Sequence, residues 1–105
     1  MWNQPTPTEL SRIPGLYQTE HVPAADKIIH MHFFLGASDW FVVEYDGVDL
    51  FFGFAIINDD EANAEWDYFS LSELAAINFL GIEIDCDVYW KPVRAGDVDV
   101  LRGLI

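Results

Sequence analysis

The chain has 105 residues, 51 % of them hydrophobic and 15 % aromatic, which is enough for a single domain over residues 1–105 with a core of its own. Its 18 Asp and Glu against 5 Lys and Arg give a formal net charge of −13, which leaves direct binding to nucleic-acid phosphates or to an anionic membrane without an electrostatic basis. One cysteine, no signal-peptide pattern and no apolar run long enough to cross a bilayer together predict a soluble protein of the cytoplasm.

The N-terminal part predicts a loose arm followed by a short helix. Residues 1–5 show no periodic pattern and are expected to form the arm. The sequence TPTE at 6–9 has the capping-box pattern with proline in the first helical position, so a helix should begin there. Pro14 and Gly15 must end this helix, and residues 17–26 are expected to form a connecting loop.

Three strands are predicted next in the chain. Residues 27–35 alternate with period two between an apolar face and a mixed face, which is typical of a strand. A second strand is expected at about 40–45 and a third at about 48–57, joined at the dipeptide Asp-Gly of 46–47, a strong hairpin signal. Gly53 lies inside the third strand, which predicts a bulge or a close approach of two backbones there.

The next segment is acidic and leads into a second helix. Residues 58–65 have the composition of a loop, and a short strand is expected at 66–69. The sequence SLSE at 70–73 is a second capping-box pattern, with apolar residues following at helical spacing. Gly81 is the expected C-terminal cap of this helix.

The last predicted strand covers 82–90 and is ended by Pro92. Cys86 faces inward in this strand and is expected to be a small buried hydrophobic residue rather than a reactive thiol. The opposite face carries three evenly spaced carboxylates, Glu83, Asp85 and Asp87. The tail then has apolar residues at a spacing that suits a short closing helix, Val98, Leu101, Leu104 and Ile105.

These elements predict an α+β fold, with an antiparallel sheet of about five strands and two or three short helices packed on one face. The other face of the sheet is then expected to meet water. It would carry His30, His32, Glu83, Asp85 and Asp87.

The order of motifs resembles the domain of unknown function 2958 family of small proteins from bacteria, plasmids and phages. The resemblance covers about residues 16–93 and rests on the run at 22–54, on YFSLSEL at 68–74 and on LGIEIDCDVYWKP at 80–92. FFG at 51–53 and YFSLSEL are its most specific pieces. The family has no established catalytic residues to carry over. The resemblance implies a mobile-element setting, in which small acidic proteins often act against host defence systems.

Enzymatic and metal sites find little support in the sequence. His30 and His32, with Glu83, Asp85 or His21, could together ligate a metal, but a half-exposed histidine pair is the simpler interpretation. Carboxylate pairs such as 59–60 or 85 with 87 could serve as general acid and base only if they were buried. We expect no catalytic residue, no metal and no cofactor.

The distribution of charge carries the functional hypothesis. The 63 residues between Lys27 and Lys91 contain no Lys or Arg and 13 carboxylates. A domain of this length is roughly 33 Å across, and duplex DNA carries roughly 20 phosphate charges over that distance. The net charge is of the same order, so one face could imitate nucleic acid.

The leading prediction is therefore a non-enzymatic inhibitor from a phage or mobile element, of the anti-CRISPR or anti-restriction kind. It would occupy a basic nucleic-acid-binding site of a host defence complex, as a monomer or a homodimer. The expected contact residues are Glu83, Asp85, Asp87, Asp59, Asp60, Glu61, Glu65, Asp67, Glu44, Asp46 and Asp49.

Two other interpretations remain open at the level of sequence. The charge could serve solubility alone. The protein could also be an adaptor that binds another protein through exposed aromatic residues, because the aromatic side chains are too many for a core of this size. Candidates for that surface are Trp40, Tyr45, Phe51, Phe52, Trp66, Tyr68, Tyr89 and Trp90.

Overall fold

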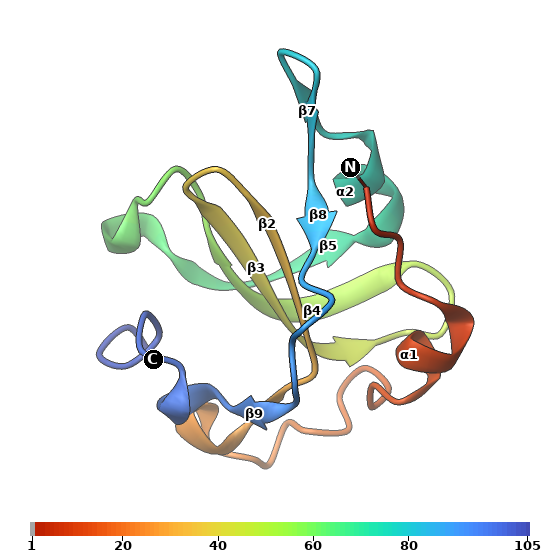
Figure 1. Cartoon of the computed structure of the whole chain (residues 1–105). Helices are drawn as coiled ribbons and strands as arrows, with labels where there is room; N and C mark the ends of the chain where they lie inside the picture. Colours follow the sequence, from red (N-terminus) through yellow and green to blue (C-terminus); the bar gives the residue numbers. More distant parts are fainter. Residues whose placement is uncertain (1) are drawn as a thin grey trace.

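The computed structural model describes residues 2–105 and shows an α+β fold built on a five-stranded antiparallel sheet in the order β5-β4-β3-β2-β8 (Figure 1). The sheet strands are β2 (Met31–Leu35), β3 (Ser38–Tyr45), β4 (Leu50–Ile56), β5 (Glu65–Ser70) and β8 (Asp85–Cys86). Two short pairs lie outside it, β1 (Ile28–Ile29) with β9 (Val93–Arg94), and β6 (Asn78–Phe79) with β7 (Ile82–Glu83). The helices are α1 (Pro7–Ser11), α2 (Leu71–Ala76) and the 3₁₀ turns η1 (Ala24–Asp26), η2 (Glu61–Asn63) and η3 (Ala95–Asp97).

Local signals placed the first helix and the central hairpin correctly. The Thr6 hydroxyl accepts a hydrogen bond from the Glu9 amide at 3.1 Å and the Glu9 carboxylate accepts one from the Thr6 amide at 2.9 Å, so the capping box is confirmed. Strands β3 and β4 form the predicted hairpin, and Gly47 in the connecting turn has a φ of 87°, which glycine adopts without strain.

Gly53 lies where two backbones approach closely, as its position in a strand predicted. A Cβ atom at this position would lie 1.8 Å from the carbonyl oxygen of Phe41. Strand β3 also has a bulge directly beside it, because the strand pairing shifts between Val42 and Glu44. The extra residue changes the alternation, so Tyr45 lies in the same core cluster as Val42.

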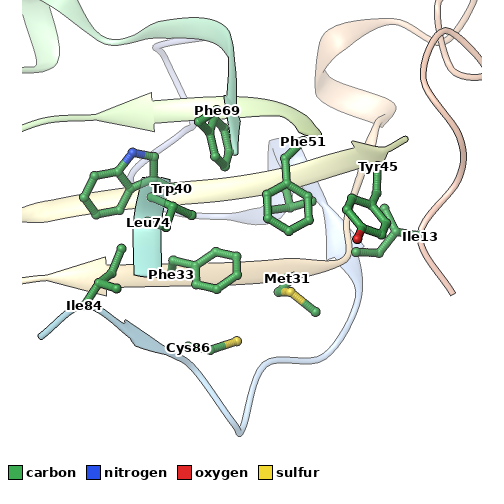
Figure 2. Packing of buried hydrophobic residues seen from close by; sticks show 11 residues of the cluster. Ile13, Met31, Phe33, Trp40, Tyr45, Phe51, Phe69, Leu74, Ile84 and Cys86 are labelled. Carbon is green, nitrogen blue, oxygen red and sulfur yellow. The ribbon is translucent and has the colours of Figure 1, made fainter. Parts of the chain in front are cut away.

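The α-helices cover one face of the sheet, as expected. Phe33, Phe51 and Leu74 lie at the centre of this first core and are almost completely buried (Figure 2). Leu10 of α1 and Leu71 of α2 pack against the same cluster. Burying a large apolar side chain contributes about 1.5–3 kcal/mol to stability, so this face holds the helices in place.

The second face of the sheet is buried too, so the prediction that it meets water is wrong. Phe41, Val43 and Phe54 point to this face and are at most 2 % exposed. The C-terminal segment covers them, with Leu101 fully buried and Val98 and three of its neighbours partly buried against the cluster. Apolar residues on both faces of the central strands require a cover on both sides.

The tail forms this cover without the predicted closing helix. After η3 it continues in turns, in which the Leu101 amide donates to the Val98 carbonyl at 3.0 Å and the Leu104 amide to the Leu101 carbonyl at 2.9 Å. The apolar positions of the tail were identified correctly, but they bury their side chains from successive turns.

The segment after α2 differs most from its prediction. Helix α2 ends at Ala76, and Leu80 and Gly81, with φ angles of 53° and 82°, form the two-residue turn of the β6–β7 hairpin. Gly81 is therefore a hairpin residue and not a helix cap. The expected strand at 82–90 is divided into β7 and β8, and the side chains of Ile82 and Val88 are 59 % and 61 % exposed.

Residues 2–5 of the expected loose arm are docked on the body of the protein. The amide of Trp2 donates to Glu83 at 2.8 Å, and its indole packs on Phe33 with ring centroids 5.9 Å apart. Asn3 binds Asp85 through its backbone amide at 2.8 Å and through its side-chain nitrogen at 2.8 and 3.0 Å. Pro5 is buried. Glu83 and Asp85, which were predicted to face a partner, thus hold the arm.

Candidate functional site

Glu44 is buried and cannot belong to an exposed acidic surface. Only 3 % of it is exposed, and its carboxylate accepts hydrogen bonds from the amides of Tyr17 at 2.9 Å and Thr19 at 3.0 Å, as well as from the Thr19 hydroxyl. The ammonium group of Lys27 reaches the same hydroxyl at 3.3 Å. A buried carboxylate needs such partners. Glu44 therefore fixes the loop before η1.

Two further predicted contact residues organise turns. The Asp46 carboxylate accepts bonds from the amides of Val48, Asp49 and Leu50 at 2.8, 2.8 and 3.0 Å, and these backbone bonds lower the pKa of Asp46. Asp49 accepts from the amide and hydroxyl of Ser72 at 2.9 and 2.5 Å, at the start of α2. Asp49 thus uses both carboxylate oxygens within the chain, and Asp46 uses one.

Glu83, Asp85 and Asp87 do not form the predicted evenly spaced edge. They lie on β7, on β8 and in the turn that follows β8. Glu83 and Asp85 hold the N-terminal arm, as described above. Asp87 accepts from the Tyr89 amide at 3.0 Å and lies 3.5 Å from the Nδ1 atom of His32. Each of the three contacts a residue that lies far from it in the sequence, so the sequence alone does not identify the partner.

Acid should release the arm, because it removes the charge of Asp85. Desolvation alone would raise the pKa of Asp85, but hydrogen bonds from Asn3 and Cys86 outweigh it and the pKa is lowered. The arm contact then stabilises the fold fully at pH values above the ordinary carboxyl pKa. This stabilisation is lost as the pH falls through the lowered pKa of Asp85. At low pH, the NMR signals of the Asn3 side-chain amide and the Trp2 indole should shift to those of a free arm. In the Asp85→Asn variant the same signals should show a free arm over a wider pH range. Signals that stay unchanged through acid titration and in the variant would contradict this contact.

Five of the predicted contact residues remain on one exposed, continuous stretch, which we call the acidic segment. It consists of Asp59, Asp60, Glu61, Glu65 and Asp67. The first three lie in the loop between β4 and β5, and the last two lie on the edge strand β5 (Figure 1). All five are exposed, and none of them forms an ion pair within residues 2–105. Their hydrogen bonds are few and local, from Asn63 to Asp60 at 2.7 Å and from the Tyr68 amide to Asp67 at 2.8 Å.

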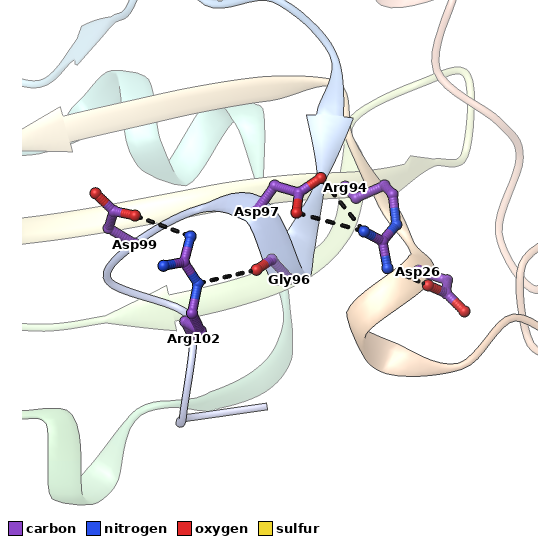
Figure 3. Close-up of polar contacts among 6 residues, drawn as sticks. All are labelled: Asp26, Arg94, Gly96, Asp97, Asp99 and Arg102. Carbon is purple, nitrogen blue, oxygen red and sulfur yellow. Dashed lines mark hydrogen bonds and ion pairs between the residues drawn. The ribbon is translucent and has the colours of Figure 1, made fainter.

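The two arginines of the C-terminal part of the chain pair with other carboxylates. Arg94 pairs with Asp26 at 2.5 Å and with Asp97 at 3.3 Å, and Arg102 pairs with Asp99 at 2.9 Å (Figure 3). The carboxylates around Arg94, Asp26 first, raise its pKa. The Arg94–Asp26 pair joins β9 to η1, whereas the Arg102–Asp99 pair lies within the C-terminal segment. Within residues 2–105 neither arginine pairs with the acidic segment.

His30 and His32 occupy different environments. His32 is stacked on Phe41 with centroids 4.7 Å apart, and its Nε2 atom lies 2.7 Å from Asp39. His30 follows β1, and burial lowers its pKa. Within the described residues there is no group of three or more His, Cys, Asp or Glu that could hold a metal ion.

The aromatic residues divide between core and surface. Trp40, Tyr45 and Phe51 are buried. Phe52 stacks with Trp66, with centroids 5.8 Å apart, and contacts Tyr68 at 5.1 Å. Tyr68 is 44 % exposed, so an aromatic surface does lie on the edge strand, on the face opposite Glu65 and Asp67.

Cys86 is buried, and its thiol is expected to be unreactive. Burial, with a smaller contribution from nearby carboxylates of which Glu9 is the first, raises the pKa of the thiol to about 12. The reactive thiolate is then scarce at pH 8. A disulfide reagent should react with the folded protein only as fast as the chain opens, and at once in denaturant. Rapid labelling of the folded protein would contradict the buried position.

Sequence reasoning missed an apolar groove of about 560 Å³ beside the acidic segment. It lies between the β2–β3 turn, the end of β4 and the segment that joins α2 to the β6–β7 hairpin. Its apolar lining includes Leu35, Trp40, Ile57, Ile77 and Ile82. No local sequence signal predicted the hairpin that forms one wall of the groove, because its turn has leucine where asparagine or glycine is usual.

Comparison with known proteins gives no relative from which a function could be transferred. No family model matches the chain, no curated protein matches it, and no solved structure matches its fold. Within residues 2–105, no helix is both long and apolar enough to span a membrane. The candidate site therefore rests on the chain's own chemistry, in which the acidic segment is the main exposed feature.

Proposed function

We propose that this protein is a non-enzymatic inhibitor that acts in the cytoplasm and binds a basic, nucleic-acid-binding site of a partner complex through its acidic segment. The expected partner is a nuclease of a host defence system, and the expected setting is a phage or mobile element. The observation that carries the proposal is the set of five exposed carboxylates of the acidic segment, which form no ion pair with any of residues 2–105.

The amount of negative charge on the protein, compared with that on duplex DNA of the same length, supports this proposal. The molecule is 39 Å along its longest axis, a length over which duplex DNA carries about 23 phosphate charges. A formal net charge of −13 gives the protein a field of similar order. A basic cleft that attracts phosphates would attract the acidic segment for the same reason.

The position of the acidic segment is a second support. Strand β5 is an edge strand, so its carboxylates lie where another molecule can approach them. On a strand, Glu65 and Asp67 point to the same side about 6.7 Å apart. Charges on an edge also prevent strand pairing between copies, so this role and partner binding are compatible.

The adaptor function is the alternative that one observation favours. Phe52, Trp66 and Tyr68 form an aromatic surface on the other side of the same edge strand. Aromatic contacts depend little on salt, whereas contacts between exposed charges weaken as salt screens them. The salt response of the complex therefore separates the two functions.

The test is capture of partners from the lysate of a bacterial host, with the wild-type protein and with a variant of neutralised acidic segment side by side. The proposal expects a nucleic-acid-handling complex that is held by the wild type only, released at moderate salt and displaced by added duplex DNA. A partner that binds both proteins equally, through high salt and in the presence of DNA, would overturn it in favour of the adaptor.

A further inference from the structure

Exposed apolar side chains line the groove beside the acidic segment, and a further one lies at the tip of the hairpin that contributes to the groove. Ile57 and Ile82 are 46 % and 59 % exposed, and Leu80 at the tip of the hairpin is 87 % exposed. The hairpin projects away from the sheet (Figure 1). Clustered exposed apolar residues on a small protein mark an interaction surface.

The hairpin turn keeps this apolar tip at a conformational cost. Leu80 has a φ of 53°, in the left-handed region that asparagine and glycine occupy more easily. The Gly81 amide bonds the Asn78 side chain at 2.9 Å and so supports the turn. Leu80 contributes nothing to the core, and a strained residue of this kind is a reason to look for a function.

Two structural links join the groove to the acidic segment. On one face of the sheet, Trp40 in the groove pairs with Ala55, which in turn pairs with Glu65. At the end of β4, the Asp59 amide donates to the Ala37 carbonyl at 2.8 Å and fixes the acidic loop to the turn that borders the groove. Carboxylates therefore lie next to an apolar hollow, on the side formed by β5 and the loop before it.

The charge of this surface restricts what can occupy the groove. An acidic or neutral polar segment would bring no compensation to the carboxylates, and a purely apolar one would leave them beside a low-dielectric contact. A segment with both an apolar side chain and neighbouring cations can fill the apolar groove with the first and pair with the carboxylates through the second.

We propose that the groove anchors one large apolar side chain of a Lys- and Arg-rich segment of the partner protein, while the acidic segment pairs with the cations on either side. This inference rests on the proposed function and specifies the partner's chemistry. It predicts a contact with two separable parts, of which one is sensitive to salt and the other is not.

The test uses two synthetic peptides, acetyl-Lys-Arg-Phe-Arg-Lys-amide and the same peptide with alanine in the centre, titrated into the protein by NMR at low and at moderate salt. The phenylalanine peptide should bind about tenfold more tightly, a difference of about 1.4 kcal/mol. Both peptides should weaken alike as salt is added. The signals that shift with phenylalanine alone should include those of Ile57, Ile82 and Trp40.

Matched variants assign each part of the contact. Ile82→Asn should abolish the preference for phenylalanine, whereas Val88→Asn, at a residue that is 61 % exposed on another surface, should keep it. The variant Asp59→Asn, Glu61→Gln, Glu65→Gln should weaken both peptides equally and keep the tenfold ratio.

The failures of the two proposals can be told apart. Salt-sensitive binding of both peptides with equal affinity would overturn the groove and support the acidic segment. Binding of the phenylalanine peptide with an affinity that neither salt nor the neutralised variant changes, but that is lost in Ile82→Asn, would support the groove and overturn the acidic segment as a docking surface. Absence of binding by either peptide would overturn both.

Discussion

Replacing Gly53 with alanine should destabilise the protein by about 3 kcal/mol or more, because nothing at this position can make room for a methyl group. The added carbon would lie 1.8 Å from the Phe41 carbonyl oxygen and 3.1 Å from the Cα atom of Val42. Both are backbone atoms in the centre of the sheet, so strands β3 and β4 would have to separate. A domain is typically stable by about 5–15 kcal/mol, so the loss would be a large part of the total.

Gly15→Ala is the matched control for this substitution. There the new carbon would meet only the side chain of Gln18, at 3.3 Å, and that side chain can move. The free energy of unfolding, measured by urea denaturation, should fall strongly in Gly53→Ala and change by less than about 1 kcal/mol in Gly15→Ala. Equal stability of the two variants would mean that the strands are not in this register.

Neutralising the acidic segment should weaken partner binding by roughly 10- to 100-fold, if each charge pair with the partner contributes about 0.5–1 kcal/mol. The variant Asp59→Asn, Glu61→Gln, Glu65→Gln removes three carboxylates that are exposed and carry no side-chain hydrogen bond within the described residues. The fold should keep its stability. The dependence of affinity on salt should also decrease, because fewer ion pairs form in the complex.

A variant of equal net charge makes this experiment specific. Glu20→Gln, Glu73→Gln, Asp99→Asn also removes three exposed carboxylates, all of them outside the acidic segment. The ion pair that it breaks, between Asp99 and Arg102, is exposed and contributes little to stability. Long-range attraction depends on total charge, so both variants should lose some association rate. Only the variant in the acidic segment should lose most of its affinity and its ability to inhibit. Equal losses in the two variants would show that net charge alone acts, without a defined docking surface.

The sequence predicted the elements that depend on neighbouring residues. The capping box at Thr6, the hairpin at Gly47 and the close approach at Gly53 each follow from the conformational limits of a few consecutive residues. Alternation at 82–90 was misleading for the same reason. It describes one strand, whereas Ile82 and Glu83 pair with β6 and the next two-residue strand, β8, pairs with β2, so the segment is divided at Ile84.

The candidate site was only partly predictable. High acidic density at 59–67 and the lack of lysine and arginine around it are properties of the sequence, and they survive in the structure as exposed charge. The apolar groove was not predictable, because its walls come from three separate parts of the chain. The burial of the second sheet face was missed because its cover is the distant C-terminal segment.

The sequence by itself determined how much negative charge this protein carries, where the central hairpin turns and which fold class results. Only the tertiary structure decided which carboxylates are available to a partner, because a carboxylate is withdrawn when it finds donors within the chain. Glu44 finds them in Tyr17 and Thr19, and Asp85 finds them in Asn3 at the other end of the sequence. The carboxylates of Asp59 and Glu65 accept no hydrogen bond from the part of the chain that the structure describes, and so their charge remains on the surface.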